Sequence, residues 1–391
     1  MTSSRLRILE NGALEVVDPR FEDLILLRDV DPAFTILTAP LPGFTVPRFQ
    51  AMRELGCGFS IPELEGMGAD ELWLVHNSAL ERWMSSAASK CSQAEASFLA
   101  LKVELARRLL SNCVLCARRC GVDRLAGRQG YCGLGSGAIV AESFTHIGEE
   151  PQINPSFVIS LAGCALRCRY CQQAAILDPK RVSGVELNAG LWKDIDVRGA
   201  RTLSFVGGNP DESIFAILQF LNSAPPDLEL PIVWNSHAYS TLESMALLRG
   251  VVDAYLPDLK YSSPACGARW SKVEDYPAVA QQTITRMAEQ DVPVIVRILL
   301  LPGHLQCCHL PALEFLASLQ SRPLVSIRQQ YCPDWQITGR DGEMASRITG
   351  EEANCATSYA LSLGLTLVGQ SQNELDSDAK ELTHSHQAKW V

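Results

Sequence analysis

Uninterrupted apolar runs recur along the second half of the chain. The first run, 157–162, reads Phe-Val-Ile-Ser-Leu-Ala and ends at Gly163. Runs without regular polar alternation are typical of parallel strands that are covered on both faces. Five further runs of this kind follow, at 202–206, 231–235, 251–256, 292–297 and 324–328.

Helical patterns lie between these runs. In 211–222 the apolar residues stand at helical spacing, and Asp211 lies near the start, where the helix dipole favours an anion. The stretches 240–249, 277–290, 309–319 and 351–363 have similar patterns. The six strand–helix units therefore predict an α/β fold, an open (β/α)6 TIM-like partial barrel, because a complete eight-unit barrel usually takes about 250 residues.

The rest of the chain has a different character. Residues 1–95 hold scattered prolines and short apolar runs, which predict an N-terminal extension of mixed structure. Residues 96–150 begin with a helix and continue as a cysteine-rich, metal-binding segment. The barrel is expected over 151–370, and 371–391 is a polar tail.

Composition narrows the classes of function. The chain has 391 residues, of which 47% are hydrophobic and 20% charged, as in ordinary globular proteins. No apolar run approaches the roughly 18 residues that a membrane span needs. The N-terminus lacks the apolar core and cleavage site of a signal peptide, so we expect a cytoplasmic protein. The net charge of −10 disfavours nucleic-acid binding, which usually requires a basic face.

Fourteen cysteines are many for such a chain, and seven of them fall in two tight groups. The cytosol keeps thiols reduced, so grouped cysteines indicate metal centres rather than a disulfide framework. The other seven are scattered, and we expect most of them to be small buried hydrophobes. These are Cys57, Cys91, Cys266, Cys307, Cys308, Cys332 and Cys355.

One group, Cys164, Cys168 and Cys171, directly follows the first predicted strand. Three thiolates can bind three irons of a 4Fe–4S cluster and leave the fourth iron open, whereas electron-transfer clusters normally have four protein ligands. An open position suits substrate coordination, as in catalytic zinc sites. A zinc knuckle is the alternative, but no fourth Cys or His lies nearby in the sequence. The position agrees with catalysis, since strand-end loops carry the chemistry in (β/α) barrels.

The other group has the spacing Cys-x2-Cys-x3-Cys-x11-Cys, and glycines around it allow tight turns. Four thiolates that converge form a closed metal site, and both structural zinc and an auxiliary iron–sulfur cluster fit it. The presence of one expected cluster favours a second iron–sulfur cluster, with zinc as the alternative. The four ligands are Cys113, Cys116, Cys120 and Cys132.

The Cys-x3-Cys-x2-Cys motif, with Tyr170 before its last cysteine, resembles the signature of the radical S-adenosylmethionine (SAM) superfamily. Further segments resemble the PflX-type homologues of pyruvate formate-lyase activating enzyme. The likeness covers about residues 110–370 and leaves the first hundred outside it. Its segments are 112–124, 146–151, 205–210, 232–236, 255–261 and 294–303.

The resemblance implies an oxidoreductase-like enzyme that cleaves SAM reductively at a 4Fe–4S cluster and makes a 5′-deoxyadenosyl radical for hydrogen abstraction. It implies an electron donor such as flavodoxin or ferredoxin, and a glycyl radical protein as one target. The alternatives are a radical SAM enzyme that modifies a peptide or small molecule, and a non-catalytic iron–sulfur or zinc protein. The charge balance disfavours an RNA-modifying enzyme. The sequence identifies neither the substrate nor the catalytic residues.

The resemblance also suggests SAM contacts. Gly207, Gly208, Asn209 and Pro210 match a Gly-Gly-Glu-Pro motif that contacts the methionyl amino group, with Asn in place of Glu. Glycines permit close backbone approach to a ligand, and the alternative is a bare strand-ending turn. The substitution leaves the role of the Asn209 side chain open.

Polar residues at later strand ends complete the candidate site. By analogy with related activating enzymes, Asn235, Ser236, Asp258 and Lys260 are candidates for the SAM amino acid and ribose. Arg297 is a candidate carboxylate clamp, because its planar guanidinium suits bidentate recognition. His146 is expected either to line the substrate cavity or to act as a capping residue.

Overall fold

A computed structural model of the protein describes residues 5–8, 14–17, 25–26, 46–85, 91–92 and 94–368. The expected polar tail at 371–391 lies outside the described residues. The first three strands, β1 (Arg5–Ile8), β2 (Leu14–Val17) and β3 (Ile25–Leu26), form an antiparallel sheet in that order.

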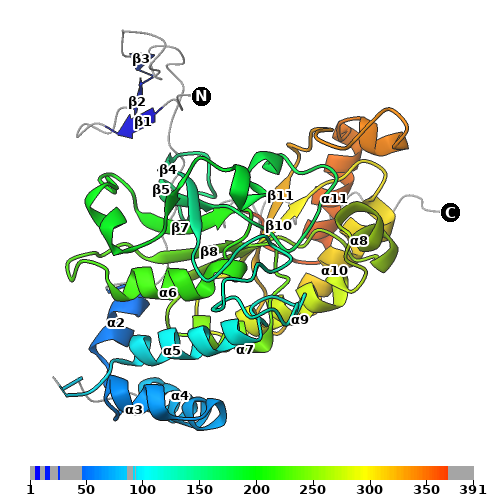
Figure 1. The fold of residues 1–391 in the computed structure, drawn as a ribbon. Coiled ribbons are helices and arrows are strands. Elements are labelled where there is room, and N and C mark those ends of the chain that lie inside the picture. The colour runs from blue at the N-terminus through cyan, green and yellow to red at the C-terminus, as the bar shows by residue number, and fades with distance from the viewer. Residues whose placement is uncertain are drawn as a thin grey trace.

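The centre of the fold is a series of parallel strands that matches the six apolar runs (Figure 1). Neighbours pair in parallel from β5 to β9 and again between β10 and β11. Two parallel bridges, Tyr255 to Val294 and Asp258 to Arg297, join β9 to β10. The predicted α/β class with a parallel sheet is therefore confirmed. The strands are β5 (Ser156–Leu161), β7 (Thr202–Gly207), β8 (Ile232–Ser236), β9 (Ala254–Pro257), β10 (Ile295–Leu299) and β11 (Leu324–Arg328).

The sheet is not a closed barrel in the described residues. β5 has β7 on one side and the antiparallel strand β4 (Ile139–His146) on the other, so β11 does not reach it. The short β6 (Val185–Glu186) then pairs with β4. The apolar pattern did not predict β4, because its residues are mostly half-buried or exposed and include Glu142, Ser143 and Thr145.

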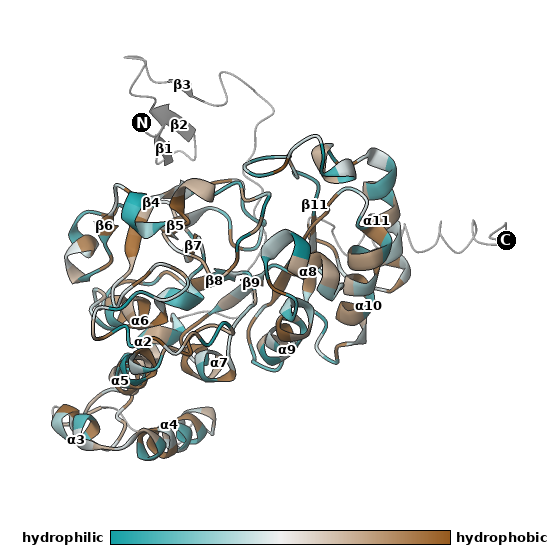
Figure 2. Ribbon diagram, turned by 45° about the vertical axis from the view of Figure 1, so that its right-hand side comes forward, coloured by the Kyte–Doolittle hydropathy of each residue, from teal (hydrophilic) through white to brown (hydrophobic). Residues whose placement is uncertain are grey.

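The helices that follow the strands cover the sheet, and five of them were predicted from their spacing. α6 (Ile214–Asn222) buries seven of its nine residues. In Figure 2 the covering helices carry both hydrophilic and hydrophobic segments, as amphipathic helices do. The others predicted are α7 (Leu242–Leu248), α9 (Tyr276–Ala288), α10 (Leu310–Ser318) and α11 (Gly350–Ser362). The helix α8 (Pro264–Ser271), opened by a proline, was not predicted.

A long helix, α5 (Phe98–Ser111), joins the N-terminal helices to the rest. It packs against α6, α7 and α2 (Arg48–Glu54) on one side and against α3 (Ile61–Gly66) and α4 (Ala69–Met84) on the other. Its Phe98, Leu101 and Leu105 are fully or almost fully buried, and burial of such side chains stabilises a fold by about 1.5–3 kcal/mol each.

Short helical turns lie in the loops. Five are 3-10 turns and one, η5 (Leu305–His309), is a π-helical turn that leads into α10. In the part of the chain that the structure describes, no helix combines the length and the apolar character needed to cross a bilayer. The 3-10 turns are η1 (Ala174–Ile176), η2 (Pro179–Arg181), η3 (Ala189–Lys193), η4 (Asp211–Ser213) and η6 (Gly342–Ala345).

The expectation for the seven scattered cysteines is wrong for most of them. Cys57 and Cys308 are buried, whereas Cys307 and Cys355 are exposed. The other three, Cys91, Cys266 and Cys332, are partly exposed. Hydrophobic burial therefore does not explain most of these thiols.

Candidate functional site

One cavity of about 380 Å³ opens at the carboxyl ends of the parallel strands. Its volume is in the range of ordinary small-molecule sites. Strands β4, β5, β7, β8 and β10 all contribute to it, so the open sheet curves around the cavity. All sequence-predicted residues of the first cysteine group and of the SAM set line it, except the buried Pro210. These are Cys164, Cys168, Cys171, Gly207, Gly208, Asn209, Asn235, Ser236, Asp258, Lys260 and Arg297.

The loop with the three cysteines is fixed against α8. The backbone N–H of Arg167 donates to the Ser271 carbonyl at 3.1 Å, and that of Arg169 donates to the Trp270 carbonyl at 2.8 Å. The Ser271 hydroxyl also lies 3.0 Å from the Cys168 sulfur. A helix that the sequence did not predict therefore holds this loop in place.

The three thiols stand in an environment that disfavours their charge. Burial raises the pKa of Cys164 well above its usual value, and the Glu212 carboxylate adds to this effect. Burial and then the neighbouring Cys168 raise the pKa of Cys171 to about 11. For Cys168, burial also raises the pKa, although Lys260 opposes it. A bound metal reverses this balance, because coordination deprotonates a thiol outright.

The two glycines at the end of β7 are required by the packing of the chain itself. A side-chain carbon on Gly207 would lie 2.5 Å from the Leu161 carbonyl oxygen, and Gly207 has a φ of 104°. On Gly208 it would lie 2.8 Å from the carbonyl carbon of Gly163. Both glycines line the cavity, but their presence has a reason that involves no ligand.

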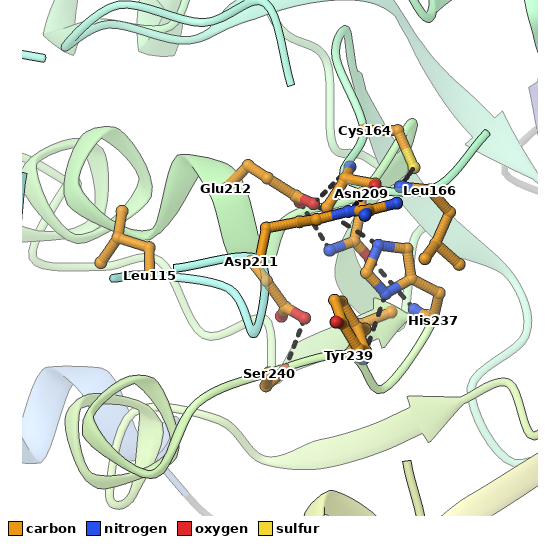
Figure 3. A network of polar contacts seen from close by, with 12 residues as sticks. Leu115, Cys164, Leu166, Asn209, Asp211, Glu212, His237, Tyr239 and Ser240 are labelled. Carbon is orange, nitrogen blue, oxygen red and sulfur yellow. Dashed lines mark hydrogen bonds and ion pairs between the residues drawn. The ribbon is translucent and has the colours of Figure 1, made fainter. Parts of the chain in front are cut away.

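The Asn209 side chain belongs to a buried network that joins three strand ends (Figure 3). Its amide nitrogen donates to a carboxylate oxygen of Glu212 at 2.6 Å, and its amide oxygen accepts from the His237 backbone at 3.0 Å. The other Glu212 oxygen accepts from the Ala165 backbone at 2.7 Å. The Asn that replaces the expected Glu thus ties the cysteine loop to the ends of β7 and β8.

Sequence reasoning missed His237, which directly follows the predicted pair at the end of β8. Its Nδ1 accepts from the Tyr239 backbone at 3.2 Å, so the neutral ring carries its hydrogen on Nε2. Nε2 is buried without a hydrogen-bond partner and lies 3.4 Å from Glu212. A ring nitrogen of His237 is also within 4.8 Å of the Cys164 sulfur.

Cys164, Glu212 and His237 are close enough to suggest a single-ion site, but their bonding argues against one. Both oxygens of Glu212 already accept amide hydrogens. A protonated Nε2 has no lone pair to offer a metal. Glu212 and His237 are better described as part of a hydrogen-bonded network that supports the cysteine loop. In this network the Nε2–H of His237 has no hydrogen-bond acceptor.

An ion pair faces the cavity from the end of β9. Lys260 Nζ donates to Asp258 at 2.6 Å. Burial opposes the charge of Lys260, but Asp258 and then Cys168 outweigh it and raise the pKa of the ammonium group well above its usual value. Beside them, the hydroxyl oxygen of Ser236 accepts from the Ala238 backbone at 3.2 Å. The cavity thus presents fixed charges of both signs.

Arg297 is held by two glutamates that precede β5. Its Nε donates to Glu150 at 2.7 Å, and its Nη2 contacts both Glu149 and Glu150. The sequence did not pair these residues, although both glutamates lie in one of the segments that resemble the activating enzymes. A substrate carboxylate would have to compete with them, so the clamp stays a prediction. In the same segment, His146 lines the cavity and its Nδ1 also accepts from the Gly148 backbone at 3.1 Å.

The second cysteine group lies beside the first. Cys113, Cys116 and Cys132 are buried, and Cys120 is exposed. A side-chain carbon on Gly130 would lie 3.3 Å from the Cys132 sulfur and 3.5 Å from the Cys120 sulfur. Burial raises the pKa of Cys132 to about 11, partly opposed by Arg124, and raises that of Cys116 well above its usual value.

Arg124 connects the two groups. Its guanidinium is 1% exposed, lies 3.6 Å from the Cys113 sulfur and donates to the Glu212 carbonyl at 2.8 Å. On the other side, a side-chain carbon on Gly163 would lie 2.8 Å from the Cys132 carbonyl oxygen. The chain therefore holds the second cysteine group next to the loop of the first, although only the thiols of the first group line the cavity.

No protein-family model matches the chain. A domain of pyruvate-formate lyase-activating enzyme from Bacteroides vulgatus has 18% identity, covers 36% of this chain and 80% of that one, and gives a TM-score of 0.30. SuiB of Streptococcus suis has 12% identity, covers 60% of this chain and 52% of that one, and gives a TM-score of 0.37. TM-scores this low do not by themselves establish a common fold.

One curated protein is much closer in sequence. The uncharacterized protein MJ0674 of Methanocaldococcus jannaschii is 31% identical over 325 residues, which cover 79% of this chain and 92% of that protein. This chain therefore belongs to the family of the uncharacterized protein MJ0674.

Proposed function

We propose that the chain is a radical SAM enzyme with a partial (β/α)6 barrel. The main support for this proposal is the position of the candidate residues. The three cysteines of a single loop, the glycine pair after β7 and the polar ends of β8 and β9 all line the same cavity. The cysteines were selected mainly from their spacing and the strand-end residues from the family resemblance, and the position of both sets on one cavity supports a common cofactor site.

The donor set fits a 4Fe–4S cluster. Cys164, Cys168 and Cys171 offer three thiols at the cavity wall, and in the described chain their three sulfurs do not together form a group within 4.8 Å of one another. A single ion would need such close ligands, whereas a cluster separates its thiolates more widely. The unpaired Nε2–H of His237 beside Cys164 is a further donor for a cluster sulfur.

The polar lining fits the methionyl end of SAM, which carries an ammonium and a carboxylate group. Asp258 would accept from the ammonium group and Lys260 would donate to the carboxylate, with Asn235 and Ser236 available for further hydrogen bonds. With both groups bound, the cluster would supply the electron that cleaves SAM into methionine and a 5′-deoxyadenosyl radical, which would abstract a hydrogen atom from the substrate. The chain itself holds the reactants in place and excludes water.

The identity of the substrate rests on the sequence resemblance. A glycyl radical partner protein is the proposed target, and a peptide or small molecule is the alternative. A flavodoxin or ferredoxin would supply the electron. The cysteine-rich composition favours a reducing compartment, which supports a cytoplasmic location.

For the second cysteine group we propose an iron–sulfur cluster rather than zinc. Two groups of three ligand atoms within 4.8 Å of one another occur in the described chain, and none of these four cysteines belongs to either. Tetrahedral zinc would bring its thiolates within about 4 Å of one another. The positive Arg124 next to Cys113 offsets part of the charge that four thiolates bring.

The test is SAM cleavage by the protein reconstituted anaerobically with iron and sulfide. With dithionite and SAM, the wild-type protein should form 5′-deoxyadenosine, which liquid chromatography measures. The Cys168→Ala variant should form none above background, because it lacks one cluster ligand. Cys355→Ser is the matched control, since Cys355 is exposed on α11 and should be dispensable.

Two results would reject the proposal. One is the absence of 5′-deoxyadenosine from a wild-type protein that contains iron. The other is equal formation by the wild type and Cys168→Ala, because a cluster that needs three thiolates cannot tolerate that loss.

A further inference from the structure

We propose that Cys266, Cys307 and Cys308 form a third metal site, which binds one thiophilic d10 cation, Zn²⁺. The site lies between α8 and the π-helical turn η5, and it is independent of the two cysteine groups and of the proposed function. None of its members belongs to a sequence motif. Cys266 and Cys307 are 41 positions apart in the sequence, so the sequence does not show that they lie together.

The sulfur positions match the spacing of zinc ligands. The sulfurs of Cys266 and Cys307 are 3.8 Å apart, and those of Cys307 and Cys308 are 3.6 Å apart. All three sulfurs lie within 4.8 Å of one another. With Zn–S bonds of about 2.3 Å in tetrahedral geometry, two thiolates of one zinc ion are about 3.8 Å apart. The site therefore needs little movement to close on an ion.

Exposure distinguishes this group from ordinary core cysteines. Cys308 is fully buried, Cys266 is partly exposed and Cys307 is exposed. Cysteines that serve as small hydrophobes are normally buried together. Here the group opens to solvent at Cys307, which gives a metal ion a path of entry and leaves room for water as a fourth ligand.

The Nε2 atoms of the nearby imidazoles accept hydrogen bonds elsewhere, so the ligands that the chain supplies are the three sulfurs. Nε2 of His304 accepts from the Trp270 indole at 2.9 Å, and Nε2 of His309 accepts from the Leu301 backbone at 2.8 Å. Thiolates without nitrogen or oxygen partners favour soft and borderline cations such as Zn²⁺ over hard cations such as Mg²⁺ or Ca²⁺. Zn²⁺ is the redox-inert member of this class, so no oxidant or reductant is needed.

The local backbone explains how neighbouring residues can both bind. Cys307 and Cys308 lie in η5, and π-helical turns are uncommon and often occur at functional sites. The hydroxyl of Ser262 donates to the Cys308 carbonyl at 2.8 Å, which ties this turn to the segment before α8. α8 and α10 lie side by side in both ribbon views (Figures 1 and 2).

An ion at this position would fix α8 against η5. α8 also carries Trp270 and Ser271, which hold the loop of Cys164, Cys168 and Cys171. The Trp270–His304 hydrogen bond already links the same two segments. Zinc would thus act as a clamp between α8 and η5, bound one helical turn before Trp270.

The experiment measures zinc in the full-length protein after anaerobic reconstitution with iron and sulfide. The protein is incubated with zinc, passed over a desalting column with a weak chelator and analysed by elemental mass spectrometry. The wild type and the exposed-cysteine control Cys355→Ser should retain one more zinc ion per chain than Cys266→Ser or Cys307→Ser. Iron content should be equal in all four proteins.

Zinc-edge X-ray absorption on the wild type should give a sulfur shell at about 2.3 Å that weakens in Cys307→Ser. Equal zinc retention in all four proteins overturns the proposal. So does an anaerobic thiol count showing that Cys266 and Cys307 form a disulfide. Circular dichroism identifies a variant that fails to fold. If one of Cys266→Ser and Cys307→Ser does not fold, the zinc content of the other tests the proposal. If the wild-type protein retains the additional zinc ion but does not cleave SAM, the proposed function is rejected and the zinc site is not.

Discussion

His237 holds a buried N–H that has no acceptor next to Cys164. If a cluster occupies the cysteine loop, this donor can hydrogen-bond to a cluster sulfur, which stabilises the more negative, reduced form. We therefore expect His237→Phe to lower the reduction potential of the cluster by an amount on the order of 60 mV, a tenfold change for one electron. A redox titration followed by electron paramagnetic resonance measures this shift.

A conservative variant separates this role from simple packing. His237→Gln retains a donor near the position of Nε2 and should recover most of the potential, whereas a purely structural residue would show the same defect in both variants. An unchanged potential in His237→Phe would contradict the assignment.

Gly208 offers a prediction about stability at the same scale. A methyl group there would collide with the backbone of Gly163, with 2.8 Å to its carbonyl carbon, and a backbone cannot move aside as a flexible side chain can. Gly208→Ala should therefore destabilise the fold by about 3 kcal/mol, the upper end for overpacking. Urea unfolding measures this change.

The matched control is Gly66→Ala at the end of α3, where a methyl group meets nothing within 4 Å. Because alanine is the better helix former, that change should stabilise the protein by up to about 1 kcal/mol. If the two substitutions changed the free energy of unfolding by similar amounts, the backbone of Gly163 would be able to move away from residue 208.

Among the elements, the segment before β5 is tied to β10 and β11 through one carboxylate. Glu150 accepts from Arg297 on β10 and from Ser326 and Arg328 on β11, at 2.7 to 2.8 Å. Burial alone would raise the pKa of Glu150, but Arg297 and then Arg328 outweigh it and lower the pKa from 4.5 to about 2. This network ties the connection between β4 and β5 to β10 and β11, and in the described residues no strand pairing joins these two parts of the sheet.

The sign of the pH effect follows from this depressed pKa. The stabilisation is fully present above the unfolded-state pKa of 4.5 and is lost as the pH falls toward about 2. Glu150→Gln should therefore cost about 3 kcal/mol at pH 7 and much less at pH 3. Urea unfolding of the metal-free, reduced chain at both pH values measures the difference.

Glu351→Gln is the control for Glu150, because Glu351 is exposed in the first turn of α11 and should change stability by less than about 1 kcal/mol at either pH. A constant difference between wild type and Glu150→Gln from pH 7 to pH 3 would mean that this carboxylate does not titrate as described.

The same elements show what the sequence could and could not predict. The parallel strands were predicted because burial on both faces leaves continuous apolar runs, as in Phe157–Leu161. β4 was missed because a strand whose residues are mostly half-buried or exposed leaves no such run. The bonds of Glu150 to Arg297 and Arg328 were missed because they join residues 147 and 178 positions apart.

The candidate site also contains residues that the sequence indicated and residues that it did not. Cys164, Cys168 and Cys171 were grouped as candidate ligands from their spacing and from the family resemblance, because all three lie in one loop. His237 and the group of Cys266, Cys307 and Cys308 could not be found in this way, since their relevance depends on which strand ends and helices the fold brings together.

At the scale of the whole molecule, the fold places the two main cysteine groups next to each other. The carbonyl of Cys132 packs on Gly163, and Arg124 reaches from Cys113 to Glu212. The contacts with Gly163 and Glu212 use backbone carbonyls, and the only thiol that Arg124 reaches here is Cys113 of the second group, so none of them depends on the thiols of Cys164, Cys168 and Cys171. The second group should therefore keep its metal when these three thiols are removed.

This independence gives the final prediction. With a 4Fe–4S cluster in each group, the reconstituted wild type should contain about eight iron ions per chain, and a Cys164→Ala, Cys168→Ala, Cys171→Ala triple variant should contain about four. Elemental analysis measures both. A triple variant with one additional zinc ion and no iron would assign zinc to the second group. A variant without either metal would show that Cys113, Cys116, Cys120 and Cys132 form no independent site.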